Sequence, residues 1–213
     1  MINLKQIALT QKTGEEALTN NGFKTPYNLL DFWRWSVSDI LSNATRGRLA
    51  EFIVGTAMNI NNEIVRKEWD AYDLKTKDGI KIEVKSSSYI QTWSQKKFSN
   101  IIFSIKSSRA LEGETQLGEP KRQADVYVFC LLKHKVQETI DPLKLEQWEF
   151  YVLPTYKIDN YKRSKSSITI NSLNKLTNPT LYDDLKTAIE KANIEQQIYL
   201  QKLRDSQQIS QFQ

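Results

Sequence analysis

Cysteine and histidine are almost absent from this chain of 213 residues, which contains one of each. The single cysteine, Cys130, cannot form a disulfide within the chain, and we expect a small buried hydrophobe in a reducing compartment. The single histidine, His134, cannot supply the ligands of the common zinc clusters or serve a His-based nuclease site. We therefore expect His134 to be a surface-loop residue.

Long hydrophobic runs are also missing, since no apolar stretch approaches the roughly 20 residues that span a bilayer. The first residues, Met1 to Lys5, do not begin a signal peptide. We therefore expect a cytoplasmic protein. The glycine-rich loop that cradles phosphates is absent as well, which argues against ATP-driven action within this chain.

Large apolar side chains are plentiful, with 39% hydrophobic residues and five Trp, nine Tyr and eight Phe. This content is that of an ordinary globular protein that can bury a core. We expect one domain over residues 1–180 and a C-terminal helix and tail over 181–213, used for docking or dimerisation. The net charge of +5 favours a polyanionic partner such as nucleic acid.

The order of periodic segments predicts an α/β fold, with a central mixed β-sheet flanked by helices and a C-terminal helix. Helices are predicted over 27–35, 43–59 and 181–203, and strands over 64–67, 100–105, 124–132, 148–153 and 167–170. Within 43–59 the predicted buried stripe consists of Leu49, Phe52, Ile53, Thr56 and Ala57. Glu51 lies near the border of that stripe. Residues 107–123 are predicted to form a loop.

Loop length decides the register of a hairpin predicted around Lys77-Asp78-Gly79. A three-residue loop closed by a left-handed glycine pairs Leu74 with Ile82 and Asp73 with Glu83. A two-residue turn would oppose Leu74 to Glu83 and mix the apolar and charged faces. We therefore predict the three-residue loop, whose other pairs are Thr76 with Ile80, Tyr72 with Val84 and Lys75 with Lys81.

This register places Asp73, Glu83 and Lys85 on one face of the hairpin. Directly opposed carboxylates repel by up to about 1 kcal/mol, and a divalent cation such as Mg²⁺ turns that repulsion into coordination. The ion would polarise a scissile phosphate and lower the pKa of the attacking water. Lys85 could position that water or neutralise developing charge. A solvated charged hairpin without a site is the alternative interpretation.

Asp73 followed by Glu83-Val84-Lys85 on the next strand, with Glu51 on a preceding helix, resembles the PD-(D/E)XK nuclease superfamily. The resemblance covers about residues 43–105 and implies a restriction-endonuclease-like fold. It also implies that Glu51, Asp73 and Glu83 hold one or two Mg²⁺ ions, with Mn²⁺ as a substitute. Lys85 would then assist the hydrolytic water.

Two residues qualify this resemblance. Tyr72 stands where the name of the superfamily has Pro, a departure that its members tolerate widely. Asp70 competes with Asp73 for the role of the strand-end carboxylate. Strand alternation puts Asp70 on the opposite face, and we therefore rank it below Asp73.

Polar and basic side chains close to the motif are candidates for contacts with DNA phosphates, sugars and bases. They are Arg46, Arg48, Ser86, Ser87, Gln91, Lys96 and Lys97. Gln91 also matches a polar residue that some superfamily members carry shortly after the E-x-K strand. A polar loop and a charge pair at a helix end are equally simple interpretations of these residues.

Together these patterns favour a Mg²⁺-dependent DNA endonuclease that hydrolyses phosphodiester bonds. Because one site cuts one strand, we expect a homodimer acting on double-stranded DNA. The alternative hypothesis is a catalytically inactive protein of the same fold that binds nucleic acid or a protein partner. A third is a non-enzymatic interaction protein whose hairpin charges are structural.

Overall fold

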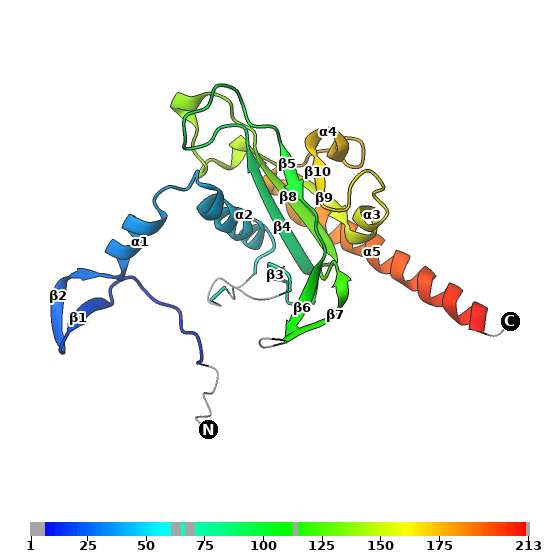
Figure 1. Cartoon of the computed structure of the whole chain (residues 1–213), viewed down its shortest axis with the longest axis horizontal. Helices are drawn as coiled ribbons and strands as arrows, with labels where there is room; N and C mark the ends of the chain where they lie inside the picture. Colours follow the sequence, from blue (N-terminus) through cyan, green and yellow to red (C-terminus); the bar gives the residue numbers. More distant parts are fainter. Residues whose placement is uncertain (1–6, 61–64, 67–70, 113–114, 212–213) are drawn as a thin grey trace.

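The computed structural model describes residues 7–60, 65–66, 71–112 and 115–211 (Figure 1). The strand predicted over 64–67 lies mostly outside these ranges, and its two described residues, 65 and 66, form no strand. Asp70 also lies outside the described residues. The helices are α1 (Leu29–Val37), α2 (Asn43–Ala57), α3 (Thr155–Asp159), α4 (Ile170–Leu173) and α5 (Tyr182–Gln211). The strands are β1 (Ala17–Asn20), β2 (Phe23–Asn28), β3 (Leu74–Lys75), β4 (Lys81–Ser88), β5 (Ile102–Ser104), β6 (Ser108–Glu112), β7 (Thr115–Lys121), β8 (Val126–Leu132), β9 (Trp148–Pro154) and β10 (Ser167–Thr169).

A four-stranded mixed sheet forms the centre of the molecule, in the order β3-β4-β8-β9. Strands β4 and β8 are parallel, while β3 and β9 are antiparallel to their neighbours. All seven residues of β8 are buried, because both of its edges are paired and both of its faces are covered. The α/β class and the mixed sheet flanked by helices are confirmed.

The two faces of the sheet carry separate hydrophobic cores. On one face Ile82, Val84 and their neighbours pack against α2 and α5. On the other face Tyr127, Phe129 and Leu131 pack under β5, β10 and α4. Because strand side chains alternate, Glu83 and Lys85 of β4 belong to this second face, directly beside Tyr127 and Phe129 in the parallel ladder.

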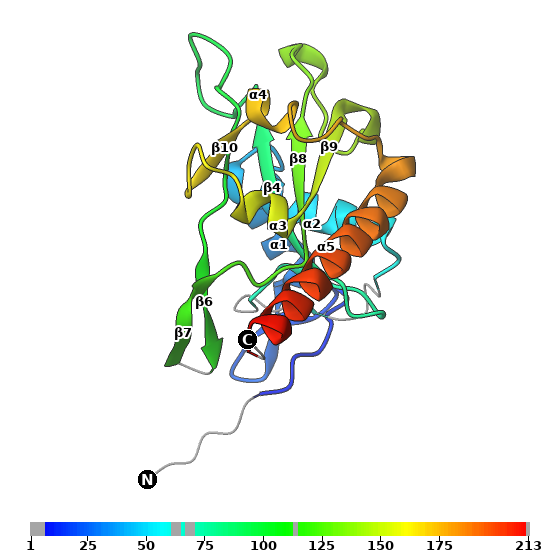
Figure 2. The same ribbon diagram turned by 90° about the vertical axis from the view of Figure 1, so that its right-hand side faces the viewer.

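Helix α5 docks on its own domain over its first half. Leu185, Ile189 and Ala192 lie in the core between α5 and the sheet, and the rest of the helix extends past the sheet (Figure 2). Of the two roles expected for the segment after residue 180, docking is therefore present in the structure. None of the described helices combines the length and the apolarity needed to cross a membrane.

The buried stripe predicted for α2 was partly wrong. Ile53 is buried as expected, but Phe52 is 55% exposed, and the helix turns Ala50 and Val54 toward β4 instead. Small side chains on this face allow α2 to lie close to the strand. The turn of the helix still leaves Glu51 at the border of the packed face, half-buried.

Two hairpins were not predicted. One joins β1 to β2 through Asn21 and Gly22, both with positive φ, and it projects from the sheet together with α1 (Figure 1). The other joins β6 to β7 within residues 107–123, which had been expected to form a loop. Neither hairpin belongs to the central sheet.

Candidate active site

The hairpin that carries the motif has the predicted register. Leu74 pairs with Ile82 and Lys75 with Lys81, and the amide of Thr76 donates to the carbonyl of Ile80 at 3.0 Å. Gly79 closes the loop with a φ of +89°, in the left-handed region that favours glycine. The three-residue loop is therefore confirmed.

The ladder between β3 and β4 begins at Leu74, two residues later than predicted, so Asp73 lies outside it. β3 begins at Leu74, and the Asp73 amide donates to the carbonyl of Ile82 at 3.1 Å. The Asp73 carboxylate, through Oδ2, accepts from the amide of Val84 at 2.8 Å. The predicted ladder pairs Asp73–Glu83 and Tyr72–Val84 are thus replaced by a side-chain contact, because the edge amide of Val84 needs an acceptor where β3 has ended.

Glu83 and Lys85 lie two residues apart on β4 and contact each other. Lys85 Nζ is 2.5 Å from Glu83 Oε1, and the two side chains are only 29% and 20% exposed. Burial raises the pKa of Glu83, the negative charges of Asp73 and Glu51 raise it further, and Lys85 opposes the shift. The three predicted carboxylates are therefore close enough to share one electrostatic environment.

Arg66 joins two of these carboxylates, a partner that the sequence analysis did not identify. Its guanidinium donates to both oxygens of Glu51, with Nη2 3.0 Å from Oε1. The same Nη2 lies 3.9 Å from Asp73 Oδ1. The only signal in the sequence for such a partner was charge balance, because three carboxylates close together require a cation nearby. Charge balance does not identify which Lys or Arg supplies that cation.

The metal prediction can be compared with this geometry. In the part of the chain that the structure describes, no group of three or more His, Cys, Asp or Glu side chains is arranged to hold a metal ion. Arg66 lies between Glu51 and Asp73 instead. The donor chemistry of Asp73 and Glu83 nevertheless fits Mg²⁺, which proteins bind through one or two carboxylates, waters and substrate phosphate oxygens.

Three residues predicted to contact DNA meet inside the protein. Arg46 is only 3% exposed. Its guanidinium donates to Ser86 Oγ at 3.1 Å, Gln91 Oε1 at 3.2 Å, Leu41 O at 2.7 Å and Asn43 Oδ1 at 2.6 Å. Removal from water lowers the pKa of Arg46. This network ties α2 to the end of β4 and gives the buried Arg46 guanidinium an internal role. Ser86 and Gln91 are half-buried, and their contact with DNA stays a prediction.

The remaining candidates for DNA contact lie nearer to solvent. Arg48, Lys96 and Lys97 are exposed and Ser87 is half-buried. Their contact with DNA stays a prediction. Cys130 is fully buried in β8, where burial raises the pKa of its thiol. His134 follows β8, and its Nε2 lies 2.7 Å from Thr139 Oγ1.

The chain matches the model of a known family. A family model described as "Bacteriophage T4 endonuclease IV" matches residues 3–172. Comparison with curated proteins gives no match. The matched span is well over half of the chain and includes all of the candidate site residues, whereas α5 lies outside it.

Proposed function

The chain belongs to the bacteriophage T4 endonuclease IV family, and on that premise we propose that it hydrolyses phosphodiester bonds of DNA at the cluster of Glu51, Asp73, Glu83 and Lys85. The observation that carries this assignment is the gathering of Glu83, Lys85, Asp73 and Glu51 at one end of the β3–β4 hairpin, where burial and the charges of Asp73 and Glu51 also raise the pKa of Glu83. A half-buried carboxylate with a raised pKa, grouped with further charged side chains, is typical of catalytic sites.

The order of the site residues also supports a PD-(D/E)XK nuclease of restriction-endonuclease-like fold. Helix α2 brings Glu51 to the edge of a mixed sheet, and the β3–β4 hairpin brings Asp73 and the Glu83-Val84-Lys85 segment there. The order of these residues along the chain is the one on which the resemblance rests. Among the described residues, the pairing of β3 with β4 reaches no further than Ile82, and we propose that a DNA strand approaches the carboxylates along this edge.

We propose that Asp73 and Glu83 would hold Mg²⁺ or Mn²⁺, with Glu51 contributing negative charge beside them. When bound, such an ion supplies Lewis-acid stabilisation of the phosphate and a more acidic water. The ammonium of Lys85 now lies against Glu83. If Glu83 held the ion, Lys85 would be able to donate to a phosphate oxygen and stabilise the negative charge that develops there.

A catalytically inactive DNA-binding protein is the second candidate. It is favoured by the cations that already neutralise the carboxylates, Arg66 on Glu51 and Lys85 on Glu83. The two candidates differ in turnover. An inactive protein binds DNA with an affinity that falls as salt rises but leaves the strand intact.

The test is cleavage of circular DNA, single-stranded and duplex, with Mg²⁺, with Mn²⁺ and with EDTA. The proposal expects linear products with either metal and none with EDTA. Intact circles under all three conditions would leave only the binding function. The duplex substrate and the homodimer stay predictions, which the same assay and light scattering of the protein with and without DNA can test.

A further inference from the structure

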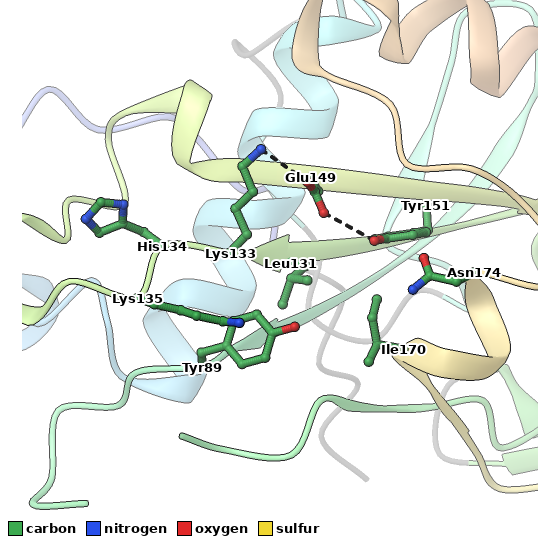
Figure 3. A pocket seen from close by; sticks show the side chains of 9 residues that line it. All are labelled: Tyr89, Leu131, Lys133, His134, Lys135, Glu149, Tyr151, Ile170 and Asn174. Atoms are coloured by element: carbon green, nitrogen blue, oxygen red, sulfur yellow. Dashed lines mark hydrogen bonds and ion pairs between the residues drawn. The ribbon is translucent and has the colours of Figure 1, made fainter. Parts of the chain in front are cut away.

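A cavity of about 500 Å³ opens at the end of β8, beyond the candidate active site (Figure 3). The cavity lies on the face of the sheet that carries Glu83 and Lys85. Two of its lining residues show this, because Tyr151 belongs to the hydrophobic core of that face and Tyr89 packs against the same core. Its volume is within the range of ligand-binding pockets, about 300–1,000 Å³. The cavity therefore lies on the same face of the sheet as the Glu83–Lys85 pair.

The aromatic side of the cavity is formed by Tyr89. The ammonium of Lys135 lies 4.2 Å from the centroid of the Tyr89 ring, and Phe98 contacts the ring edge to face, with centroids 6.2 Å apart. Phe98 fixes the orientation of the ring. The Lys135 ammonium covers one face of the ring in a cation–π contact, which marks that face as a site for a charged or planar partner once the lysine moves away.

The polar side of the cavity is held in place by hydrogen bonds. Glu149 accepts from Lys133 Nζ at 3.1 Å through one oxygen and from the Tyr151 hydroxyl at 3.2 Å through the other. Figure 3 shows Tyr89, Glu149, Tyr151 and the amide of Asn174 around the space beside Leu131. Glu149 and Tyr151 are thus held by hydrogen bonds, and together with the Asn174 amide they offer donors and acceptors that can meet the edge of a planar heterocycle.

We infer that the cavity binds one unstacked nucleotide of the DNA strand that is cleaved, with its base on Tyr89 and its phosphate on Lys135. The inference rests on the proposed function. An aromatic platform beside a basic side chain is the combination that binds single-stranded nucleic acid. A phosphate is a stronger partner for the Lys135 ammonium than the ring is, so its arrival would free the ring face for the base.

The distance along β4 between Lys85 and Tyr89 fits one continuous DNA strand that reaches both residues. Tyr89 follows Lys85 by four residues, or about 13 Å in a β-strand. About four stacked nucleotides of one strand span that length at 3.4 Å each, and fewer do so when the strand is stretched. The cavity would therefore hold a base a few nucleotides away from the bond that is cut.

The test uses Glu83→Gln protein, so that binding is measured without cleavage, and a single-stranded oligonucleotide that carries bromouracil. After irradiation, the crosslinked peptide identified by mass spectrometry is expected to contain Tyr89. In the same background, Tyr89→Leu is expected to weaken binding about 5- to 150-fold, the effect of losing one stacked base. Tyr89→Phe keeps the ring and is expected to retain the affinity, and thermal unfolding verifies that both variants fold.

A matched pair of lysines tests the phosphate contact. Lys135→Gln is expected to reduce the salt slope of single-strand binding by about 0.7, whereas Lys144→Gln, an exposed lysine on the same connection between β8 and β9, leaves it unchanged. Crosslinks confined to other peptides, or full affinity in Tyr89→Leu, would overturn the inference. Cleavage by the unmodified protein tests the proposed function separately, because these binding measurements do not depend on turnover.

Discussion

The guanidinium of Arg66 holds the carboxylate of Glu51 with two nitrogen donors, one of them 3.0 Å from Oε1. The same arginine approaches Asp73 Oδ1 to 3.9 Å. The single positive charge of this side chain thus lies beside two of the carboxylates that the proposed chemistry needs. A divalent cation at Asp73 and Glu83 would bind beside this positive charge and be repelled by it.

Replacing Arg66 is therefore expected to strengthen cation binding. Arg66→Gln should lower the dissociation constant for Mn²⁺ about 3- to 10-fold, the size of effect expected for a partly exposed charge. Titration calorimetry or the electron paramagnetic resonance of free Mn²⁺ measures this constant. Lys75→Gln, which removes an exposed charge from β3, is the control. Equal affinity in Arg66→Gln and the unmodified protein would show that the arginine does not compete with the metal.

The raised pKa of Glu83 predicts a specific dependence of stability on pH. The folded state holds this proton more tightly than the unfolded chain does, so the free energy of unfolding falls as pH rises from about 4.3, the ordinary value for glutamate, through the raised pKa. Glu83→Gln has no such loss. It should match the unmodified protein at low pH and be the more stable of the two at neutral pH.

Urea unfolding at several pH values, without divalent cations, checks this expectation. Glu146→Gln provides the control, because Glu146 is exposed in the turn before β9. A difference between Glu83→Gln and the unmodified protein that stays constant across pH would show that Glu83 does not titrate as the geometry requires.

Arg46 is expected to matter for stability through its internal hydrogen bonds. Arg46→Gln leaves Ser86, Gln91 and two further acceptors without their buried donor, and should lower the free energy of unfolding by about 2–4 kcal/mol. The exposed Arg163→Gln should change it by less than about 0.5 kcal/mol. Urea denaturation measures both, and a neutral Arg46→Gln would remove the structural role given to this residue.

Lys96 and Lys97 are expected to contact the DNA backbone. Each Lys→Gln change should reduce the slope of log affinity against log salt by about 0.7 on single strands and 0.9 on duplexes. Arg46→Gln should not change this slope, since its guanidinium is enclosed by protein. Fluorescence anisotropy over a range of salt concentrations gives the slopes. Unchanged slopes for both lysine variants would place the backbone path elsewhere.

The parts of the site that could be predicted from the sequence are those set by local rules. Side-chain alternation and the need for glycine at position 79 determine the register of Leu74 and Ile82. The apolar run of β8 indicates burial on both faces in the same way. These features depend on neighbours in the chain, so the pattern contains the information.

The parts that could not be predicted depend on distant partners. Arg46 is charged and would ordinarily be exposed, yet acceptors up to 45 residues away in the chain enclose it. Arg66 pairs with Glu51 and Asp73 although it belongs to no helix or strand. Asp73 leaves the ladder because a side-chain hydrogen bond to Val84 replaces the strand pairing. Sequence patterns carry no record of such tertiary contacts.

Cleavage by Glu83→Gln tests the central claim most directly. The unmodified protein with Mg²⁺ or Mn²⁺ should linearise circular DNA. The Glu83→Gln variant should bind the same DNA while its cleavage rate falls at least about 100-fold, because a ligand of the proposed ion is lost. Cleavage by Glu83→Gln at the rate of the unmodified protein, with the fold shown to be intact, would contradict the assignment of the active site to this cluster.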